Sequence, residues 1–526
     1  MPNIYQYIKI LYSNKTWFKR DEKLDALKSI AELGSPFASS SIFQYIFSFN
    51  RKLSLHAADT VHILMQKVKP SQWTQLYPSF QNLKIYKHQL SFLSQFADSV
   101  AVDLLGIASL NGDGYIREAA IERLYTLTSP RKFAYILLRL GDWVPQVRQT
   151  AMSAISHFLQ TGRAGEFMQY IYILEWMTRV ERVDLAPVRK RIISAIISSS
   201  SQTLYETLNS PDWHVRYFSY QTLLSKEPDN QQLIEIGSKD FNSTIRWSVF
   251  QHICSISNTV KAQNISLFLH DPSPRISSSA MKVISDDQWE KFYDIVFQNI
   301  FHNSFCIRNT ARYLLKEHDF DTFADEYRNR LESGTITPGI VSGLAETGNK
   351  DDFDLILACH LNIKPSVRSA AIAGLYRVDE VQSIPYLIEA LKDSHSKVRR
   401  TSVSLLCKSR HFDNQSIRKI FNNERPESRI SALHALCCKS NWELLNDILF
   451  LVTDPEETVR KVAWDKYAQW YLKRSVSNWA KPPKSVLNKI EKRIMELDSK
   501  QLPEHVLKYW KDLPNLIESG KKIWGY

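Results

Sequence analysis

The stretch that decides the fold is Asp393-Ser-His-Ser-Lys-Val398-Arg399-Arg400-Thr-Ser402-Val403-Ser-Leu-Leu406, because its pattern of residue types returns along most of the chain. The pattern begins with an acid or amide, and an Arg preceded by a branched apolar residue follows six positions later. Small or apolar residues stand three, four and seven positions after the Arg. These positions share one face of a helix, so each copy predicts an amphipathic helix.

Copies of this pattern recur at a nearly constant spacing. The full copies pair Asp142 with Arg148, Asp240 with Arg246, Asp393 with Arg399, and Asp454 with Arg460. Including looser copies, the Arg position (the Arg slot) falls at residues 117, 148, 189, 216, 246, 277, 308, about 338, 368, 399, 429 and 460. Successive slots are 30 or 31 residues apart, except for 41 and 27 around Arg189. A fixed period in this range predicts a stack of repeats.

Each repeat contains a second apolar stretch between one slot helix and the next, such as residues 384–391. We therefore predict an all-α fold, an α-solenoid of about 13–15 stacked helical pairs. Residues 1–104 are helical but poorly phased, and we expect divergent or capping repeats there, with a separate domain as the alternative. The phased repeats cover residues 105–475, and a C-terminal helical cap covers residues 476–526.

The pattern D-x-x-x-x-V-R-x-x-A-a-x-a-L resembles the HEAT repeats, in particular the short bacterial form first named for phycobilin lyases. The resemblance covers roughly residues 105 to 475. It implies an armadillo-type superhelix that serves as a scaffold for protein-protein interaction. Many activities share this fold, so any activity has to be argued from a site.

The repeated Arg needs a partner, because a positive charge in the first helical turn opposes the helix macrodipole. We expect the acid six residues earlier, in the same repeat or the adjacent one, to pair with it. A row of phosphate-binding arginines is the weaker alternative, since each Arg of a full copy has its own acid. The predicted structural ladder comprises Asp142, Arg148, Asp240, Arg246, Asp393, Arg399, Asp454 and Arg460.

Candidate binding residues lie at the helix starts. The residue after each slot should point away from the core, toward a concave surface, and Tyr217 and Trp247 occupy this position in consecutive repeats. Trp213 and Trp143 occupy matching loop positions ahead of their helices. Exposed aromatic rings there are typical anchors for a peptide or for unstacked bases. Packing of Tyr217 and Trp247 on one another is an equally weighted alternative.

The net charge of +12 favours an acidic partner, and nucleic acid is one possibility. The basic residues that could bind nucleic acid together with the aromatic residues are Lys190, Arg191, Arg400 and Lys461.

The six cysteines form no C-x-x-C pair, so we expect them to be small buried hydrophobic residues of a protein in a reducing compartment. No apolar run is long enough for a membrane span, and the N-terminus lacks the features of a secretory signal, which together predict a cytoplasmic protein.

No catalytic residue, metal site or cofactor is predicted. The chain has no P-loop, no G-x-S-x-G, no H-E-x-x-H, and none of the His-Glu dipeptides that iron-dependent HEAT enzymes use. The sequence therefore favours a non-catalytic scaffold that binds a protein partner on its concave surface. The alternatives are a nucleic-acid-binding protein and, with less support, a lyase-type or glycosylase-type HEAT enzyme. The oligomeric state stays open.

Overall fold

The computed structural model describes residues 4–13, 20–198, 201–409, 411–438, 442–477, 481–497 and 502–524. These residues form helices joined by turns, without a β-strand in the described ranges. The prediction of an all-α, α-solenoid fold is confirmed. In the same ranges, no helix combines the length and apolar character that crossing a bilayer requires.

The chain divides into two compact units, Met1–Leu267 and Phe268–Tyr526. The helices of the first unit are α1 (Ile4–Tyr12), α2 (Arg20–Leu33), α3 (Ser39–Ile42), α4 (Arg51–Gln66), α5 (Tyr77–Phe80), α6 (Gln89–Leu93), α7 (Asp98–Ala108), α8 (Gly114–Thr126), α9 (Lys132–Arg139), α10 (Pro145–Gln160), α11 (Ile171–Trp176), α12 (Ala186–Ser198), α13 (Ser201–Thr207), α14 (Trp213–Lys226), α15 (Gln231–Ser238), α16 (Ser243–Ile256) and α17 (Asn258–Asn264). Helix α18 (Ser266–Leu269) spans the boundary.

The second unit continues with the same alternation of helices. They are α19 (Pro274–Lys282), α20 (Trp289–Asn299), α21 (Phe305–Glu317), α22 (Phe323–Glu332), α23 (Pro338–Thr347), α24 (Phe353–Leu357), α25 (Pro365–Val378), α26 (Glu380–Ala390), α27 (Ser396–Leu406), α28 (Asn414–Arg418), α29 (Pro426–Leu436), α30 (Trp442–Leu451), α31 (Glu457–Ser477), α32 (Lys484–Glu496) and α33 (Glu504–Trp524). The predicted division at residues 104 and 475 stays a prediction.

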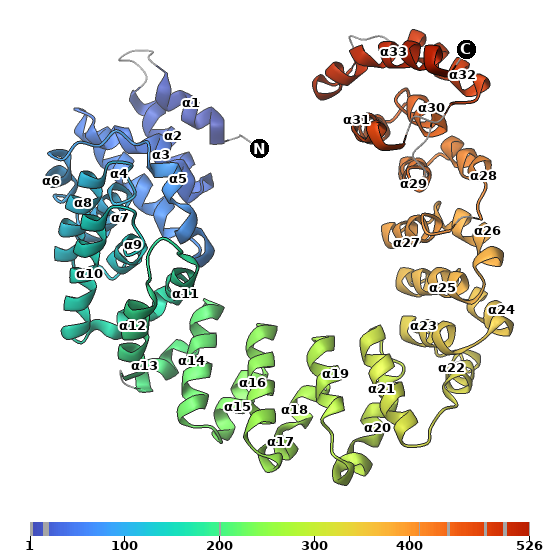
Figure 1. The fold of residues 1–526 in the computed structure, drawn as a ribbon, viewed down its shortest axis with the longest axis horizontal. Helices are drawn as coiled ribbons and strands as arrows, with labels where there is room; N and C mark the ends of the chain where they lie inside the picture. Colours follow the sequence, from blue (N-terminus) through green and yellow to red (C-terminus); the bar gives the residue numbers. More distant parts are fainter. Residues whose placement is uncertain are drawn as a thin grey trace. The chain divides into compact units, whose positions relative to one another are not determined.

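The Arg slot is the fourth residue of its helix in every copy that has an Arg, from Arg117 in α8 to Arg460 in α31. These slot helices contact one another directly, as α14 and α16 do in the first unit and α23, α25 and α27 in the second. The intervening helices α24 and α26 form a second row beside them (Figure 1). Each repeat is therefore one slot helix and one backing helix.

The slot helices begin where the sequence supplies a cap or a proline. Asp113, Asp212 and Asn242 each accept a hydrogen bond from the backbone N–H two residues later. Proline takes the first position of α10, α25 and α29, where its missing N–H costs nothing. The apolar positions around the slot are buried, as Ile245 and Val249 show with no exposed surface. Burying each such side chain stabilises the stack by about 1.5–3 kcal/mol.

The slot arginine first binds the loop that precedes its own helix. Its Nη1 donates to the main-chain oxygens six and five residues earlier, at 3.0 Å for Asn111 and 2.8 Å for Gly112 in the case of Arg117. The same pair of contacts recurs at Arg148, Arg216, Arg246, Arg308, Arg368, Arg399, Arg429 and Arg460. The guanidinium thus satisfies two loop carbonyls that no helix can use.

The rest of the guanidinium binds the next repeat. Nε and Nη2 of Arg429 donate to the two carboxylate oxygens of Asp454, both at 2.7 Å. The same two-bond pairing joins Arg117 to Asp142, Arg216 to Asp240, and Arg368 to Asp393. Each of these carboxylates also accepts the backbone N–H two residues on, at 2.7–2.9 Å. One guanidinium therefore connects two loops from consecutive repeats.

This geometry distinguishes the two pairings that the sequence left open. The carboxylate pairs with the Arg of the preceding repeat, and the Arg of the same repeat takes the main-chain oxygen of the acid instead. The same-repeat contacts are Arg148 to Asp142, Arg246 to Asp240, Arg399 to Asp393 and Arg460 to Asp454, at 2.7–2.8 Å.

Slots without an Arg keep part of this function. Ser277 donates its hydroxyl to the main-chain oxygen of Leu269, eight residues earlier, at 2.6 Å. Ser54, in the poorly phased N-terminal region, makes the same contact to Ile46. Both serines are buried. A hydroxyl reaches one carbonyl of the preceding turn but cannot reach a neighbouring repeat.

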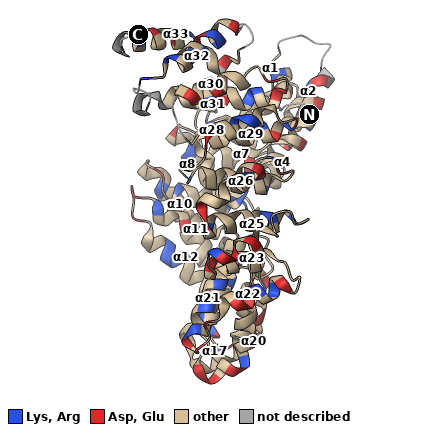
Figure 2. Cartoon of the chain, turned by 90° about the vertical axis from the view of Figure 1, so that its right-hand side faces the viewer, with Lys and Arg blue, Asp and Glu red and all other residues tan. Residues whose placement is uncertain are grey.

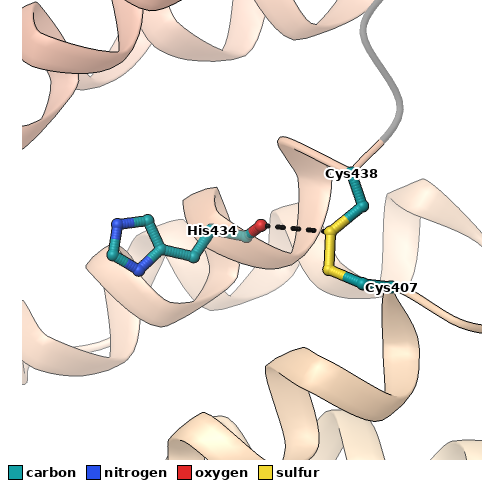
Figure 3. The surroundings of a disulfide bond; sticks show 3 residues. All are labelled: Cys407, His434 and Cys438. Atoms are coloured by element: carbon teal, nitrogen blue, oxygen red, sulfur yellow. Dashed lines mark hydrogen bonds between the residues drawn. A yellow bond between two sulfur atoms is a disulfide. The ribbon is translucent and has the colours of Figure 1, made fainter. Parts of the chain in front are cut away.

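Two details differ from the expectations. The apolar and aromatic residues of the stretch 166–177 predict one long helix, but the stretch divides into a 3-10 helix η5 (Arg163–Tyr170), α11, and a 3-10 helix η6 (Met177–Arg179). Cys407 and Cys438 were expected to be buried thiols, but they are exposed and joined by a disulfide (Figure 3). They lie 31 residues apart, close to one repeat period, so neighbouring helix ends bring their Cα atoms to 5.2 Å.

The inter-repeat pairing gives a first prediction. Replacing Arg429 by Gln leaves the Asp454 carboxylate, whose side chain is only 5% exposed, without its guanidinium. We expect the free energy of unfolding to fall by about 3–5 kcal/mol, because an uncompensated buried charge remains. Urea denaturation followed by circular dichroism measures the loss, with hydrogen exchange in α29 and α31 as the local readout.

Arg399→Gln is the matched control. Among the described residues, Arg399 binds the main-chain oxygens of Asp393 and Ser394 and no carboxylate. We expect its loss to be about 1–2 kcal/mol. Equal losses in the two variants would contradict a stabilising role for the inter-repeat carboxylate.

The ladder also predicts sensitivity to acid. Burial alone would raise the pKa of Asp240 and Asp393, but hydrogen bonds from Arg216, from Arg368 and from backbone N–H groups hold both pKa values below the ordinary 3.8. A carboxyl with a lowered folded-state pKa stabilises the fold above about pH 4 and loses this contribution as the pH falls through that pKa. Stability should therefore drop from about pH 4 downward. Replacing both Asp240 and Asp393 by Asn should reduce the dependence of the free energy of unfolding on pH. Parallel curves of this free energy against pH for the variant and the parent chain would contradict the prediction.

Candidate functional site

Aromatic rings gather at the start of α14, where Trp213 and Tyr217 were predicted as binding residues. Asp212 caps the helix and accepts hydrogen bonds from the backbone N–H of His214 at 3.0 Å and from its Nδ1 at 2.9 Å. The Trp213 ring lies on the His214 imidazole, with ring centroids 3.9 Å apart, and 6.4 Å from the Tyr217 ring. The structure therefore brings Tyr217 and His214 together around the Trp213 ring.

A groove of about 490 Å³ adjoins this cluster, and we call it the α14 groove. Trp73, Tyr170 and Tyr172 form its aromatic wall, and the turn 209–212 forms the opposite side. Tyr172 contacts His214, with ring centroids 5.0 Å apart, and so connects the groove to the Trp213 cluster. Its volume lies within the roughly 300–1,000 Å³ that ligand clefts usually have.

Tyr170, in the aromatic wall of the groove, is uncharged near neutral pH. Burial raises the pKa of Tyr170 to about 12, and its hydroxyl donates to the main-chain oxygen of Pro130 at 3.2 Å. Two carboxylates, Glu206 and Asp212, line the rim. The groove thus combines apolar rings with an acidic edge.

The other two predicted aromatic residues, Trp247 and Trp143, have contacts of their own. Trp247, on the adjacent slot helix α16, is half-buried and packs on Phe250, with ring centroids 5.5 Å apart. Trp143 is 54% exposed and meets Tyr77 edge-on at 5.2 Å. Trp143 borders a second cavity of about 210 Å³, which we call the Trp143 pocket. Trp73 lies in the wall of both cavities.

Two of the residues that follow a slot line a groove between neighbouring slot helices. Glu118 and Gln149 both face a groove of about 490 Å³ whose lining comes from α8 and α10 alone. The sequence assigned these positions to a surface lined by the backing helices. The slot helices themselves form this surface, because they pack directly against one another.

The predicted basic residues are exposed but belong to different elements. Lys190 lies on α12 in the first unit, whereas Arg400 lies on α27 and Lys461 on α31 in the second. Lys461 borders a cavity of about 810 Å³ together with Arg460 and Asp454. Helix α22 carries both Arg and Asp or Glu, whereas α21 carries Arg and Lys with one Glu at its end (Figure 2).

Sequence reasoning missed several residues of both cavities. Trp73 and Tyr77 come from the poorly phased N-terminal region. Tyr170 and Tyr172 come from the enlarged repeat, which is the 41-residue segment between the slots at Arg148 and Arg189. Their only signal was the aromatic content of these two segments. Within the described ranges, no cluster of three or more His, Cys, Asp or Glu could hold a metal ion.

No family model matches the chain, and no curated protein matches it significantly. Solved structures resemble it at low identity. Yeast importin-beta (Kap95p) matches 99% of this chain and 67% of its own, with 11% identity and a TM-score of 0.29. The karyopherin Kap121p, bound to the extreme C-terminus of the protein phosphatase Cdc14p, matches 99% of this chain and 68% of its own, with 12% identity and a TM-score of 0.31.

The chain spans about two thirds of the length of these karyopherins, which are HEAT-repeat proteins. An engineered protein matches 98% of this chain and 99% of its own, with 11% identity and a TM-score of 0.18. Similarities at these identities and TM-scores identify neither a family nor a partner for this chain.

Proposed function

We propose that this chain is a non-catalytic helical-repeat scaffold whose α14 groove binds an extended segment of a partner protein. The observation that carries the proposal is the series of ring contacts from Tyr172, which lines the groove, through His214 to Trp213, which lies beside it. Aromatic side chains in a concave, partly desolvated site are the usual anchors of a protein interface. Stacked repeats supply the rigid frame that holds them.

The chemistry of the groove narrows the class of segment. Apolar or aromatic side chains fit against Trp73, Tyr170 and Tyr172, and a Lys or Arg fits the rim that Glu206 and Asp212 provide. Ser210 and Asn209 offer polar groups for the main chain of an extended peptide. The expected segment therefore has apolar side chains next to a basic one.

Several finer points belong to the same proposal. The repeat length and the Arg-centred pattern support a short HEAT repeat of bacterial type, and we propose a cytoplasmic location with it. The spacing of the Arg slots in the sequence supports binding on a concave surface. It also supports the division of the chain at residues 104 and 475. Nucleic acid remains the alternative partner, using Lys190, Arg400 and Lys461.

Selection of phage-displayed random peptides on the full-length chain tests the proposal. We expect apolar-basic peptides to be enriched, and their binding to weaken by roughly thirtyfold in Trp213→Ala or Tyr172→Ala, as loss of a hot-spot side chain worth about 2 kcal/mol predicts. Tyr313→Ala is the matched control, because Tyr313 is a 59% exposed tyrosine on α21, outside the groove. Fluorescence anisotropy of synthetic copies gives the Kd values.

A salt titration in the same assay separates the two kinds of partner. Peptide binding in an aromatic groove should change little with salt, whereas nucleic-acid binding weakens steeply. Peptides that bind Trp213→Ala and Tyr172→Ala as tightly as the parent chain would contradict the proposal that the α14 groove is the binding site. Salt-sensitive binding of an oligonucleotide, with no peptide enriched, would favour the alternative.

A further inference from the structure

The Trp143 pocket has aromatic walls and a positively charged lining. Trp73, Tyr77, Trp143 and Trp176 supply the rings, and Arg139 and Arg182 supply the charge. The guanidinium of Arg182 lies 5.6 Å from the Trp143 ring centroid, and that of Arg139 lies 5.6 Å from the Tyr77 ring centroid. All of these residues belong to the first compact unit.

The positive charge is not balanced inside the pocket, because Asp142 already has a full set of donors. Its Oδ1 accepts from Arg117 Nη2 at 2.8 Å and from the Val144 N–H at 2.9 Å. Its Oδ2 accepts from Arg117 Nε at 2.9 Å and from Arg139 Nη1 at 3.1 Å. A carboxylate offers about four acceptor sites, so Asp142 has none left for the rest of Arg139.

Arg139 is left with a buried donor that has no partner. Its Nε is enclosed and makes no hydrogen bond, and its side chain is only 9% exposed. Burial lowers the pKa of Arg139 to about 10, Asp142 opposes this shift, and the charges of Arg117 and Arg182 add to it. Buried donors and charges without partners are costly, so native proteins contain few of them.

We propose that the Trp143 pocket binds a carboxylate carried on a flat apolar body, such as an aromatic acid. The carboxylate would neutralise the guanidinium groups of Arg139 and Arg182, while the ring would pack against Trp143 and Tyr77. The cavity of about 210 Å³ has room for one compact ring with its acid group. A free small acid and the C-terminal aromatic residue of a peptide share this chemistry.

This inference stands apart from the peptide groove, because the two cavities share only Trp73 among their lining residues. Variants of Arg182 and Trp143 therefore leave the α14 groove intact, and variants of Trp213 leave the Trp143 pocket intact.

Isothermal titration of the full-length chain with benzoate, indole-3-acetate and a short peptide ending in Trp tests the proposal. At least one of these acids should bind, and its neutral amide should bind roughly ten- to hundredfold more weakly, because the charge-assisted bonds are lost. Binding by the free acids identifies a small molecule as the source, and binding by the peptide alone identifies a chain terminus.

Arg182→Ala and Trp143→Ala should each weaken binding roughly tenfold or more, since each removes one wall or one charge. Both side chains are exposed, so these variants should fold. Arg179→Ala is the matched control, because Arg179 is an exposed arginine three residues away that does not line the pocket. Arg139→Met should abolish binding, with circular dichroism and Tm showing that the fold persists.

Equal affinity for acid and amide, or affinity unchanged in both Arg182→Ala and Trp143→Ala, would overturn the proposal. Absence of binding by every acid would overturn it as well. The Trp213→Ala variant should bind the acids as the parent chain does, so failure of the peptide groove and failure of this pocket give different results.

Discussion

The structure depends on one guanidinium that serves two consecutive repeats. Nη1 of a slot arginine holds the carbonyls of its own loop, and Nε and Nη2 hold the carboxylate that caps the next loop, as Arg368 does with Asn362 and Asp393. Only Arg offers donors in this planar arrangement, because Lys presents a single point of charge. Where it occurs, the interaction joins the loops of two consecutive repeats.

The candidate binding surface is a local departure from this arrangement. At Asp142 the ladder carboxylate serves Arg117, as the pattern requires, and also Arg139 from a backing helix. A second buried cation on one acid leaves unpaired charge, and the enlarged repeat places Trp176 and Arg182 beside it. The same irregular repeat contributes Tyr170 and Tyr172 to the α14 groove. Both cavities therefore form where the repeat period breaks.

The periodic part of the molecule could be predicted from the sequence, and the irregular part could not. The spacing predicted the slot helices and their buried faces, and the positions of Trp213 and Tyr217 followed from that phase. The sequence did not predict a binding role for Arg139, because this residue directly follows the apolar run 133–138, which indicates a core helix. Cys407 and Cys438 are 31 residues apart, which is close to one repeat period. This spacing indicates a disulfide only once the packing of neighbouring helix ends is known.

A double-mutant cycle between Arg368 and Asp393 tests the central interaction most directly. The two residues belong to consecutive repeats and contact each other through two hydrogen bonds of 2.7 and 2.8 Å. If this contact couples the repeats, Arg368→Gln and Asp393→Asn should show an interaction energy of about 1–3 kcal/mol in the free energy of unfolding. Additive effects of the two substitutions would contradict the account.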